Sequence, residues 1–596
     1  MGKTLIIAEK PSVGRDIAKV LKCKSKGDGY LYSDEYIISW AVGHLVALAD
    51  PQDYDPSLKK WSLGSLPIIP SSFQLKPIQS SKKQLDVLKK LMASKEVDSL
   101  ICATDSGREG ELIFRYIYDY AKCRKPFRRL WISSMTDKAI TEGFDKLKPG
   151  SEYDNLYRSA KCRSEADWLV GINASRAYTL RHNVLYSIGR VQTPTLAIIV
   201  ARQKEIDAFV PKDYWEIFVD FDIYKAIWVD KDKKESKIFE KEKAQAIIDK
   251  IKGKNGRVDS IEKEDKKQLP WLLYDLTELQ RDCNRKFGYT AKKTLSIAQD
   301  LYEKRKLITY PRTDSRYLTD DMKPKIRAVL QRLDFGEYKD YAQRLLDMEA
   351  LPFSKRIFDN GKVSDHHAII PTESKVNINA LSQDELNVYG LIARRFISVF
   401  YPPYLYSVTR IITIIEEENF LTKGTTINQL GFMELYKNDK DKEEGEEDAV
   451  LPELETGQEY PLSKSQLKQK KTQPPKTYTE ATLLSAMENA GRFVEDETLK
   501  EQMKDSGLGT PATRAAIIER LLQVGYLERK GRTLIPTEKG IRLISIVPEQ
   551  VKSPETTGKW EKGLSSIAKG KMDAGRFMGS IVRYVNFLVE SSRASS

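Results

Sequence analysis

Cysteine and histidine are scarce in this chain, and each scarcity excludes a class of site. Only five of the 596 residues are cysteine, and no two of them form a Cys-x-x-Cys pair. A disulfide framework and a zinc ribbon are therefore not expected, and the pattern is typical of a reducing cytoplasm. Two of the four histidines, His366 and His367, are adjacent, a spacing that does not suit a helical zinc site.

Long apolar segments are also missing. No run of about 18 apolar residues occurs, so we expect no membrane span. The opening residues MGKTLIIAEK lack the apolar core of a secretory signal. Gly-Lys-Thr at 2–4 follows no glycine-rich loop and precedes a predicted strand, so it is not a P-loop, and no ATP-driven reaction is indicated.

Positive charge is what the composition has in excess. The chain has 98 Lys and Arg against 85 Asp and Glu, a net charge of +13. Basic clefts concentrate polyanions, so this charge favours a nucleic-acid partner without proving one. A chain of 596 residues exceeds one ordinary core, and several domains are therefore expected.

The order of strand-like and helix-like segments predicts this domain organisation. Alternation over 1–150, with strands at 4–9, 99–104 and 129–134, predicts an α/β sheet. Residues 151–212 and 478–596 are predicted to be helical, and the second of these stretches has a winged-helix-like order of elements. Residues 213–274 and 401–477 are predicted to be β-rich, and residues 275–400 are predicted to be helical. We expect a solvated loop at 438–450 and a basic, proline-stiffened linker at 464–476.

Acidic residues follow two of the predicted strands. Glu9 and Lys10 end "IIAEK", and Asp105, Arg108 and Glu109 follow "LICAT". Ligands of open α/β sheets gather outside the carboxyl ends of strands, so the two exits could share one crevice and bind Mg²⁺. Polar loops after strands are the ordinary alternative.

The segment "SIGRVQTPT", residues 187–195, is a candidate phosphate seat. Thr193 is predicted to cap a helix whose first residue is Pro194, and Arg190 stands beside the free N–H groups of that helix start. An ordinary capped turn explains the segment equally well.

Tyr310 in "LITYPRTDSRYL" raises the question of a nucleophile. Its reference pKa of about 10 means that attack on phosphorus needs a base or a nearby positive charge. Arg312 could grip a phosphate with two N–H donors, and the His366 pair could contact phosphate or relay protons. A packed tyrosine at a strand end remains the alternative.

Seven segments in order resemble the type IA DNA topoisomerases, specifically bacterial topoisomerase III. They are "LIIAEKPSVGRDIA", "ATDSGREGELI", "SIGRVQTPTL", "LITYPRTDSRYL", "HHAIIPT", "YTEATLLSAMENAG" and "GLGTPATRAAIIERL". Each is modestly specific, but their shared order is highly specific. The resemblance implies a multidomain fold in which a Toprim α/β domain is joined by helical and β-rich domains that close a toroidal padlock around DNA.

The same resemblance implies a role for each candidate catalytic residue. Tyr310 would attack one DNA strand and form a 5′-phosphotyrosine link, and Arg312 and His366 would bind phosphate. Glu9 would protonate the departing 3′ oxygen while Lys10 stabilises charge on the phosphate. Asp105 and Glu109, with Glu9 nearby, would hold Mg²⁺. Much of the family has Asp-x-Asp-x-Glu here, but this chain has Gly107 at the middle acid, which favours one ion over two.

Several DNA contacts are also implied. They fall on Trp61, Trp168, Arg176, Ser187, Ile188, Gly189, Arg190, Val191, Gln192 and Arg312. Bases stack on aromatic faces for about 1–3 kcal/mol each, which fits the tryptophans.

The implied enzyme is a monomer that relaxes negative supercoils and decatenates DNA without ATP, prefers single-stranded segments, and acts in the bacterial cytoplasm at the nucleoid with a helicase as candidate partner. The rival interpretations are a Toprim-type metal-dependent nuclease and a non-catalytic ring that binds single-stranded DNA.

Overall fold

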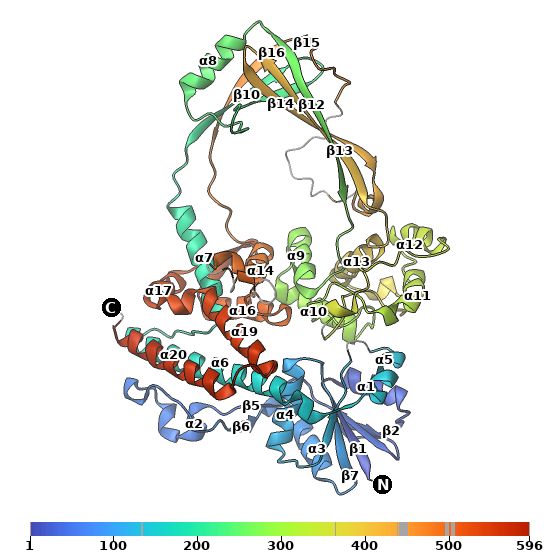
Figure 1. The fold of residues 1–596 in the computed structure, drawn as a ribbon. Helices are drawn as coiled ribbons and strands as arrows, with labels where there is room; N and C mark the ends of the chain where they lie inside the picture. Colours follow the sequence, from blue (N-terminus) through green and yellow to red (C-terminus); the bar gives the residue numbers. More distant parts are fainter. Residues whose placement is uncertain are drawn as a thin grey trace.

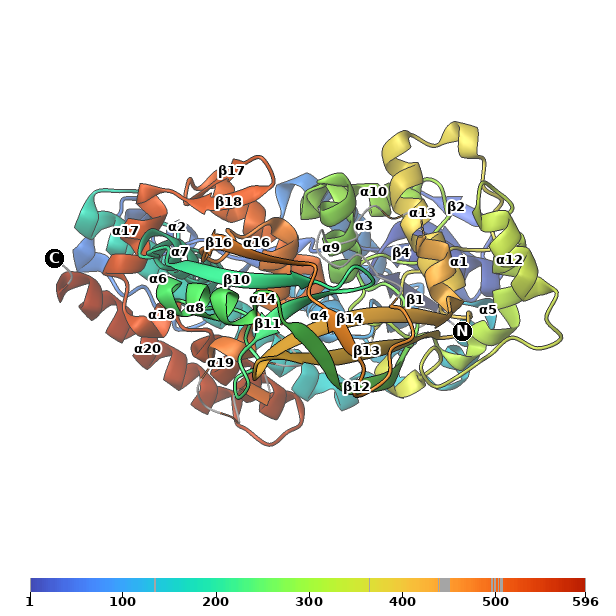
Figure 2. The same cartoon turned by 90° about the horizontal axis from the view of Figure 1, so that it is seen from above.

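The computed structural model describes residues 2–594 except 133–134, 364, 438, 440–450, 495–496, 498–499, 502 and 504–506. An arch of β-strands rises from a broad base and encloses a central opening, and both chain termini lie in the base (Figure 1). Seen from above, the strands of the arch cross over the base (Figure 2). The loop predicted at 438–450 lies outside the described residues, except for Asp439.

A mixed sheet in the base contains the first predicted strands. Its order is β2-β3-β4-β1-β7-β8-β9, and β1 (Lys3–Ala8) is parallel to both of its neighbours, β4 and β7. Leu5 and Ile7 enter one hydrophobic core, whereas Ile6 and Ala8 enter the core on the opposite face. A strand buried on both faces is typical of a parallel sheet covered by helices, and it explains the uninterrupted apolar run.

The remaining elements of this part have the following bounds: β2 (Ser25–Gly27), β3 (Tyr30–Tyr32), β4 (Tyr36–Trp40), β5 (Val46–Leu48), β6 (Leu75–Pro77), β7 (Val97–Ala103), β8 (Phe127–Arg129), β9 (Lys148–Pro149), α1 (Pro11–Val20), α2 (Pro51–Tyr54), α3 (Lys82–Ala93), α4 (Arg108–Tyr120) and α5 (Asp137–Asp145). The strand predicted at 129–134 is wrong in position, because β8 ends at Arg129 and pairs with β7 only over Phe127–Arg129.

Arg129 anchors the loop that follows β7. Its side chain is fully buried, and Nε lies 3.1 Å from Oε2 of the equally buried Glu111 on α4. Its Nη1 donates to the carbonyl of Thr104 at 2.7 Å, and its Nη2 donates to the carbonyl of Asp105 at 2.6 Å. A guanidinium shared between a carboxylate and two loop carbonyls fixes where residues 104 and 105 leave the sheet.

Helices from both ends of the chain form the rest of the base. Long α6 packs against the carboxy-terminal α19 and α20 within the largest hydrophobic core. A helix, a two-stranded hairpin and a second helix follow one another at α16–α17, the predicted winged-helix-like order. The bounds are α6 (Asp154–His182), α7 (Gln192–Asp207), α14 (Glu480–Glu488), α16 (Pro511–Gln523), β17 (Leu527–Lys530), β18 (Thr533–Pro536), α17 (Glu538–Ile546), α18 (Glu549–Lys552), α19 (Pro554–Ala568) and α20 (Ala574–Ala594).

The arch is an antiparallel sheet built from two separated stretches of chain. Its order is β15-β12-β13-β14-β11-β10-β16, and α8 packs on it over a small core. The bounds are β10 (Asp213–Asp220), β11 (Lys225–Val229), α8 (Lys241–Ile251), β12 (Asn255–Gln268), β13 (Tyr404–Ile415), β14 (Glu418–Gln429), β15 (Glu459–Pro461) and β16 (Lys464–Lys471).

The linker predicted at 464–476 is wrong over its first half, because β16 pairs with β10 along Lys464–Lys471. Four lysines in this strand suggested a solvated segment. They fit because β16 is the edge of the sheet, and exposed charge on an edge strand discourages pairing with other chains.

A helical region occupies the chain between β12 and β13. It has its own hydrophobic core and hangs beneath one end of the arch (Figure 1). Its helices are α9 (Leu276–Phe287), α10 (Ala291–Glu303), α11 (Ile326–Gln331), α12 (Tyr338–Leu346) and α13 (Gln383–Ser398). Among the described residues, no helix combines the length and apolar character needed to cross a bilayer.

We expect Arg129→Met to lower the free energy of unfolding of the amino-terminal sheet by about 3 kcal/mol, because the buried Glu111 carboxyl would keep only one arginine partner, Arg115. Calorimetric melting of the full chain measures this change.

Lys138→Met is the matched control. Lys138 and Glu142 form an exposed pair at 3.8 Å, and we expect its loss to cost less than about 1 kcal/mol. Equal shifts in the two variants would contradict the role given to Arg129.

Candidate active site

The two predicted strand exits lie side by side. Because β1 and β7 are parallel neighbours with Ala8 opposite Ala103, Glu9 and Asp105 leave the same edge of the sheet. The backbone N–H of Asp105 donates to Oε2 of Glu9 at 3.1 Å. The ends of the two strands therefore lie together at one edge of the sheet, as expected.

Lys10 binds both acids at this edge. Its Nζ lies 2.9 Å from Oδ2 of Asp105 and 3.4 Å from Oε1 of Glu9. Burial alone would lower the pKa of Lys10, but Asp105 and Glu9 raise it above its usual range, so the ammonium keeps its proton.

The two carboxyl groups respond to this environment in opposite directions. Burial and the neighbouring charge of Asp105 raise the pKa of Glu9. Burial also acts to raise the pKa of Asp105, but His366 and Lys10 outweigh it and hold that pKa well below its usual range. Glu9 therefore binds a proton more readily than Asp105 does, the division expected of two interacting acids.

Tyr310 reaches this acidic edge from the helical region. The Nζ of Lys10 lies 3.8 Å from the centre of the Tyr310 ring, and the ring of His366 lies 4.3 Å from it. Nε2 of His366 is 3.2 Å from Oδ2 of Asp105. Burial raises the pKa of the Tyr310 phenol, and Lys10 opposes that rise.

Backbone pairing explains why Tyr310 and His366 meet. The N–H of Thr309 donates to the carbonyl of Ile370 at 2.9 Å. The hydroxyl of Thr313 donates to the carbonyl of His366 at 2.7 Å. The two segments therefore run together on either side of Tyr310.

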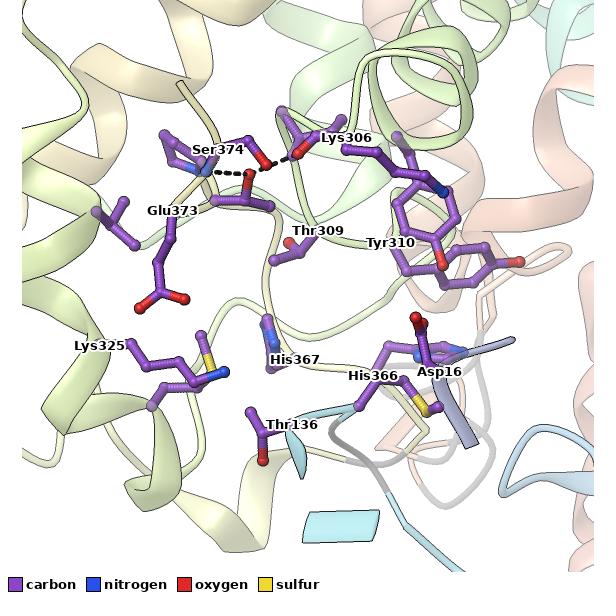
Figure 3. A pocket seen from close by; sticks show the side chains of 17 residues that line it. Asp16, Thr136, Lys306, Thr309, Tyr310, Lys325, His366, His367, Glu373 and Ser374 are labelled. Carbon is purple, nitrogen blue, oxygen red and sulfur yellow. Dashed lines mark hydrogen bonds between the residues drawn. The ribbon is translucent and has the colours of Figure 1, made fainter. Parts of the chain in front are cut away.

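A cavity of about 460 Å³ borders the phenol. Tyr310, His366 and Asp16 lie along one side of it, and Lys325 and Glu373 lie across from them (Figure 3). The Tyr310 side chain is only half-buried. The phenol therefore faces an accessible hollow and is not sealed in a core.

A second cavity, of about 450 Å³, is rich in arginine. Its cationic lining consists of Arg108, Arg163, Arg190, Arg316 and Arg514. Arg190 is buried and paired with Asp167 at 2.9 Å and Glu561 at 3.0 Å. In this structure Arg190 thus binds two carboxylates, where the sequence placed an open phosphate seat.

The loop before α7 differs in detail from its prediction. The helix begins at Gln192 with Val191 at its N-cap, so the predicted start at Pro194 is wrong. The hydroxyl of Thr193 accepts from the N–H of Gly189 at 3.2 Å, and Gln192 Nε2 donates to Oγ of Ser187 at 3.0 Å. These bonds close the turn on itself. Ile188 is buried in the adjacent core.

The predicted aromatic contacts lie in two settings. Trp61 is 36% exposed, and the guanidinium of Arg176 lies 5.0 Å from its ring centre. Arg176 is buried and donates to the carbonyl of Leu58 at 2.8 Å, so Trp61 is the accessible member of the pair. Trp168 packs edge-on against Tyr54 and Phe73, and its Nε1 donates to the carbonyl of Ala49 at 3.0 Å.

Two predicted site residues do not join the cluster around Tyr310. Arg312 is exposed, and its Nη2 donates to Oε1 of Gln299 at 2.9 Å. The exposed Glu109 carboxylate bonds to Nε2 of His44, a contact that lowers the pKa of Glu109.

The fit to Mg²⁺ rests on Glu9 and Asp105. In the part of the chain that the structure describes, no three His, Cys, Asp or Glu side chains group closely enough to hold a metal. Mg²⁺ is nonetheless commonly held through one or two carboxylates while it keeps several waters. Two adjacent carboxyl groups, one kept charged, fit that requirement.

Sequence reasoning missed two residues at this site. Asp365 lies beside His366, and burial raises the pKa of its carboxyl to about 6. His44 binds Glu109. The unusual Gly107 was the one signal in the sequence that could have pointed to Asp365. It was not enough, because the sequence alone does not say which side chain fills the space beside a glycine.

Two family models match the chain. The family described as "DNA topoisomerase" matches residues 151–579, and the Toprim domain matches residues 4–135. DNA topoisomerase 3 of Bacillus subtilis strain 168 is 45% identical over 601 residues, covering 100% of this chain and 82% of that protein. DNA topoisomerase 3 of Bacillus cereus is 44% identical over 604 residues, with the same coverage of each chain.

A solved structure of full-length topoisomerase I from Thermotoga maritima shares the fold. Its TM-score is 0.71, at 24% identity, over 98% of this chain and 90% of that one. The expected fold class, a Toprim domain within a multidomain toroid, is confirmed. The resemblance in the sequence motifs is likewise confirmed by the family and the relatives. This chain belongs to the type IA DNA topoisomerases, the isomerases that include bacterial DNA topoisomerase 3.

Proposed function

We propose that the chain cleaves one DNA strand through a transient 5′-phosphotyrosine at Tyr310, passes a second strand and religates the first, with Mg²⁺ and without ATP. The observation that carries this proposal is the meeting of Tyr310 with Lys10, Glu9 and Asp105 across two regions of the fold. A phenol beside a fixed ammonium and a carboxyl of raised pKa has the parts that phosphoryl transfer to tyrosine needs.

In the cleavage step, the Tyr310 phenol releases its proton to water, the phenolate oxygen attacks phosphorus, and the bond to the 3′ oxygen breaks. Lys10 favours the phenolate and stabilises the charge that builds on the phosphate oxygens. Glu9, whose pKa is raised by burial and by Asp105, would donate a proton to the departing 3′ oxygen. His366 contacts the phosphate beside the tyrosine, and Arg312 turns from Gln299 to reach it.

The phosphotyrosine keeps the energy of the broken bond, so the 3′-hydroxyl can reverse the reaction. Glu9 and Asp105 would hold Mg²⁺, and Glu109 would join them after leaving His44. The bound ion would neutralise phosphate charge and so favour alignment of the broken ends for religation.

DNA would enter as a single-stranded segment. We propose that Trp61 and Arg176 stack and hold it, while Trp168 and the loop from Ser187 to Gln192 support its path. Its phosphates would replace the carboxylates now paired with Arg190. The net charge of +13 attracts the polyanion.

We also propose the wider assignments. The domains are 1–150, 151–212 with 478–596, 213–274 with 401–477, and 275–400. The enzyme acts as a monomer in the bacterial cytoplasm at the nucleoid, with a helicase partner, and it both relaxes negative supercoils and decatenates DNA. The central opening under the arch suits a passed strand (Figure 1).

Tyr310→Phe should abolish plasmid relaxation and the covalent protein–DNA adduct, because the attacking oxygen is removed. Gel assays of negatively supercoiled plasmid and of adducts trapped with denaturant measure both. Tyr302→Phe is the control: its ring lies 5.4 Å from that of Tyr310, and we expect it to remain active. Metal-dependent cutting that survives Tyr310→Phe would instead identify a nuclease.

Lys10→Met should slow single-strand cleavage about 10²–10³-fold, because the positive charge beside the phenol and the phosphate is lost. Single-turnover cleavage of a labelled oligonucleotide measures the rate. Lys19→Met, which removes an exposed lysine from the helix α1 that Lys10 precedes, should leave the rate unchanged. Equal rates for wild type and Lys10→Met would refute the role of Lys10.

Chelation of Mg²⁺ with EDTA should stop relaxation and leave single-strand binding within about twofold, because the carboxylates serve the metal and not the bases. Relaxation should return when excess Mg²⁺ is added. Full relaxation in EDTA would remove the metal from the mechanism.

A further inference from the structure

Gly107 stands where much of this family has an acid, and its backbone does not require glycine. It is the N-cap residue of α4 with φ −153°, an extended conformation that any residue adopts. The reason for a small residue must therefore lie in the space around it.

The side chain of Asp365 fills that space. A methyl group added to Gly107 would lie 2.4 Å from Oδ2 of Asp365 and 3.0 Å from its Cγ. Real contacts of this kind are not shorter than 3.0 Å, so a side chain at 107 would require the carboxylate of Asp365 to leave its present place. The carboxylate comes from the segment that carries His366, on the opposite side of the site.

The charges around Asp365 also suit an acid of the active site. Asp105, Asp314, His366 and Arg129 all act on its carboxyl group. No described residue forms an ion pair or a side-chain hydrogen bond to Asp365. The amino terminus of α4, at Gly107, favours a negative charge beside it. A half-buried carboxylate next to another one is stabilised further when a cation is bound.

We propose that Asp365 replaces the acid missing at position 107, so that the tyrosine-bearing region supplies one carboxylate to the metal-binding edge of the Toprim domain. This inference rests on the proposed Mg²⁺-dependent function. Mg²⁺ commonly keeps several waters, so Asp365 can act as a positioning residue that accepts hydrogen bonds from them.

The test is a titration of Mn²⁺ into the full-length protein without DNA. The electron paramagnetic resonance signal of the free ion measures how much Mn²⁺ remains unbound. Asp365→Asn should weaken Mn²⁺ binding about 10-fold or more, the usual cost of losing an outer partner of a metal. Glu373→Gln, which removes an exposed acid of the same segment from the far side of the cavity, should bind as wild type does.

The reciprocal exchange separates a metal role from a structural one. Gly107→Asp alone should bind Mn²⁺ less tightly than wild type, because two carboxylates would compete for one place. The double variant Gly107→Asp with Asp365→Asn should recover wild-type affinity within about twofold and regain relaxation activity, since the acid returns to the Toprim side.

Two results would overturn the proposal: wild-type Mn²⁺ affinity in Asp365→Asn, or no recovery in the double variant. Thermal melting without metal checks that each variant folds, and Asp365→Ala provides the same comparison if Asp365→Asn does not. Wild-type relaxation with Mg²⁺, run alongside, reports separately on the proposed function. A relaxing enzyme with unchanged Mn²⁺ binding in Asp365→Asn would reject only the role of Asp365.

Discussion

The contact of Lys10 with Asp105 beneath the Tyr310 ring is the interaction on which the site depends. Removing two charges from water costs several kcal/mol per ion, and a buried pair repays this only with good geometry and further partners. Here Lys10 has Glu9 and an aromatic face as well, and Asp105 has His366. Because these partners come from two regions of the fold, the same contacts that tune the chemistry also hold those regions together.

The local sequence pattern was sufficient to predict that Glu9 and Asp105 lie at one edge of the sheet. It was insufficient to predict that Tyr310 packs against that edge. Glu9 and Asp105 follow apolar strands, and parallel pairing brings such exits together. Tyr310 arrives through contacts about 300 residues apart in sequence, which no short window encodes, so only the family resemblance indicated its role. Arg190 was expected to be open, but its acids Asp167 and Glu561 come from distant helices.

Composition misled most at β16. Its lysines indicated a linker, since charge usually marks solvated chain, but an edge strand needs only one partner and tolerates charge. At Gly107 the sequence suggested that an acid of the metal site had been lost. Asp365 directly precedes the segment HHAIIPT, and only coordinates reveal that its carboxylate lies beside Gly107. Long-range packing, and not local preference, accounts for both differences.

The helical region between β12 and β13 leaves and rejoins the arch at one point, where Gln268 pairs with Tyr404. The ladder above that point continues to Arg257 and Ile414. A mechanical load that pulls the region away from the arch therefore acts on the β12–β13 ladder one backbone pair at a time, starting at Gln268. The pairing of β12 with β13 would yield gradually under such a load, whereas a load along the strands would act on all pairs of the ladder at once.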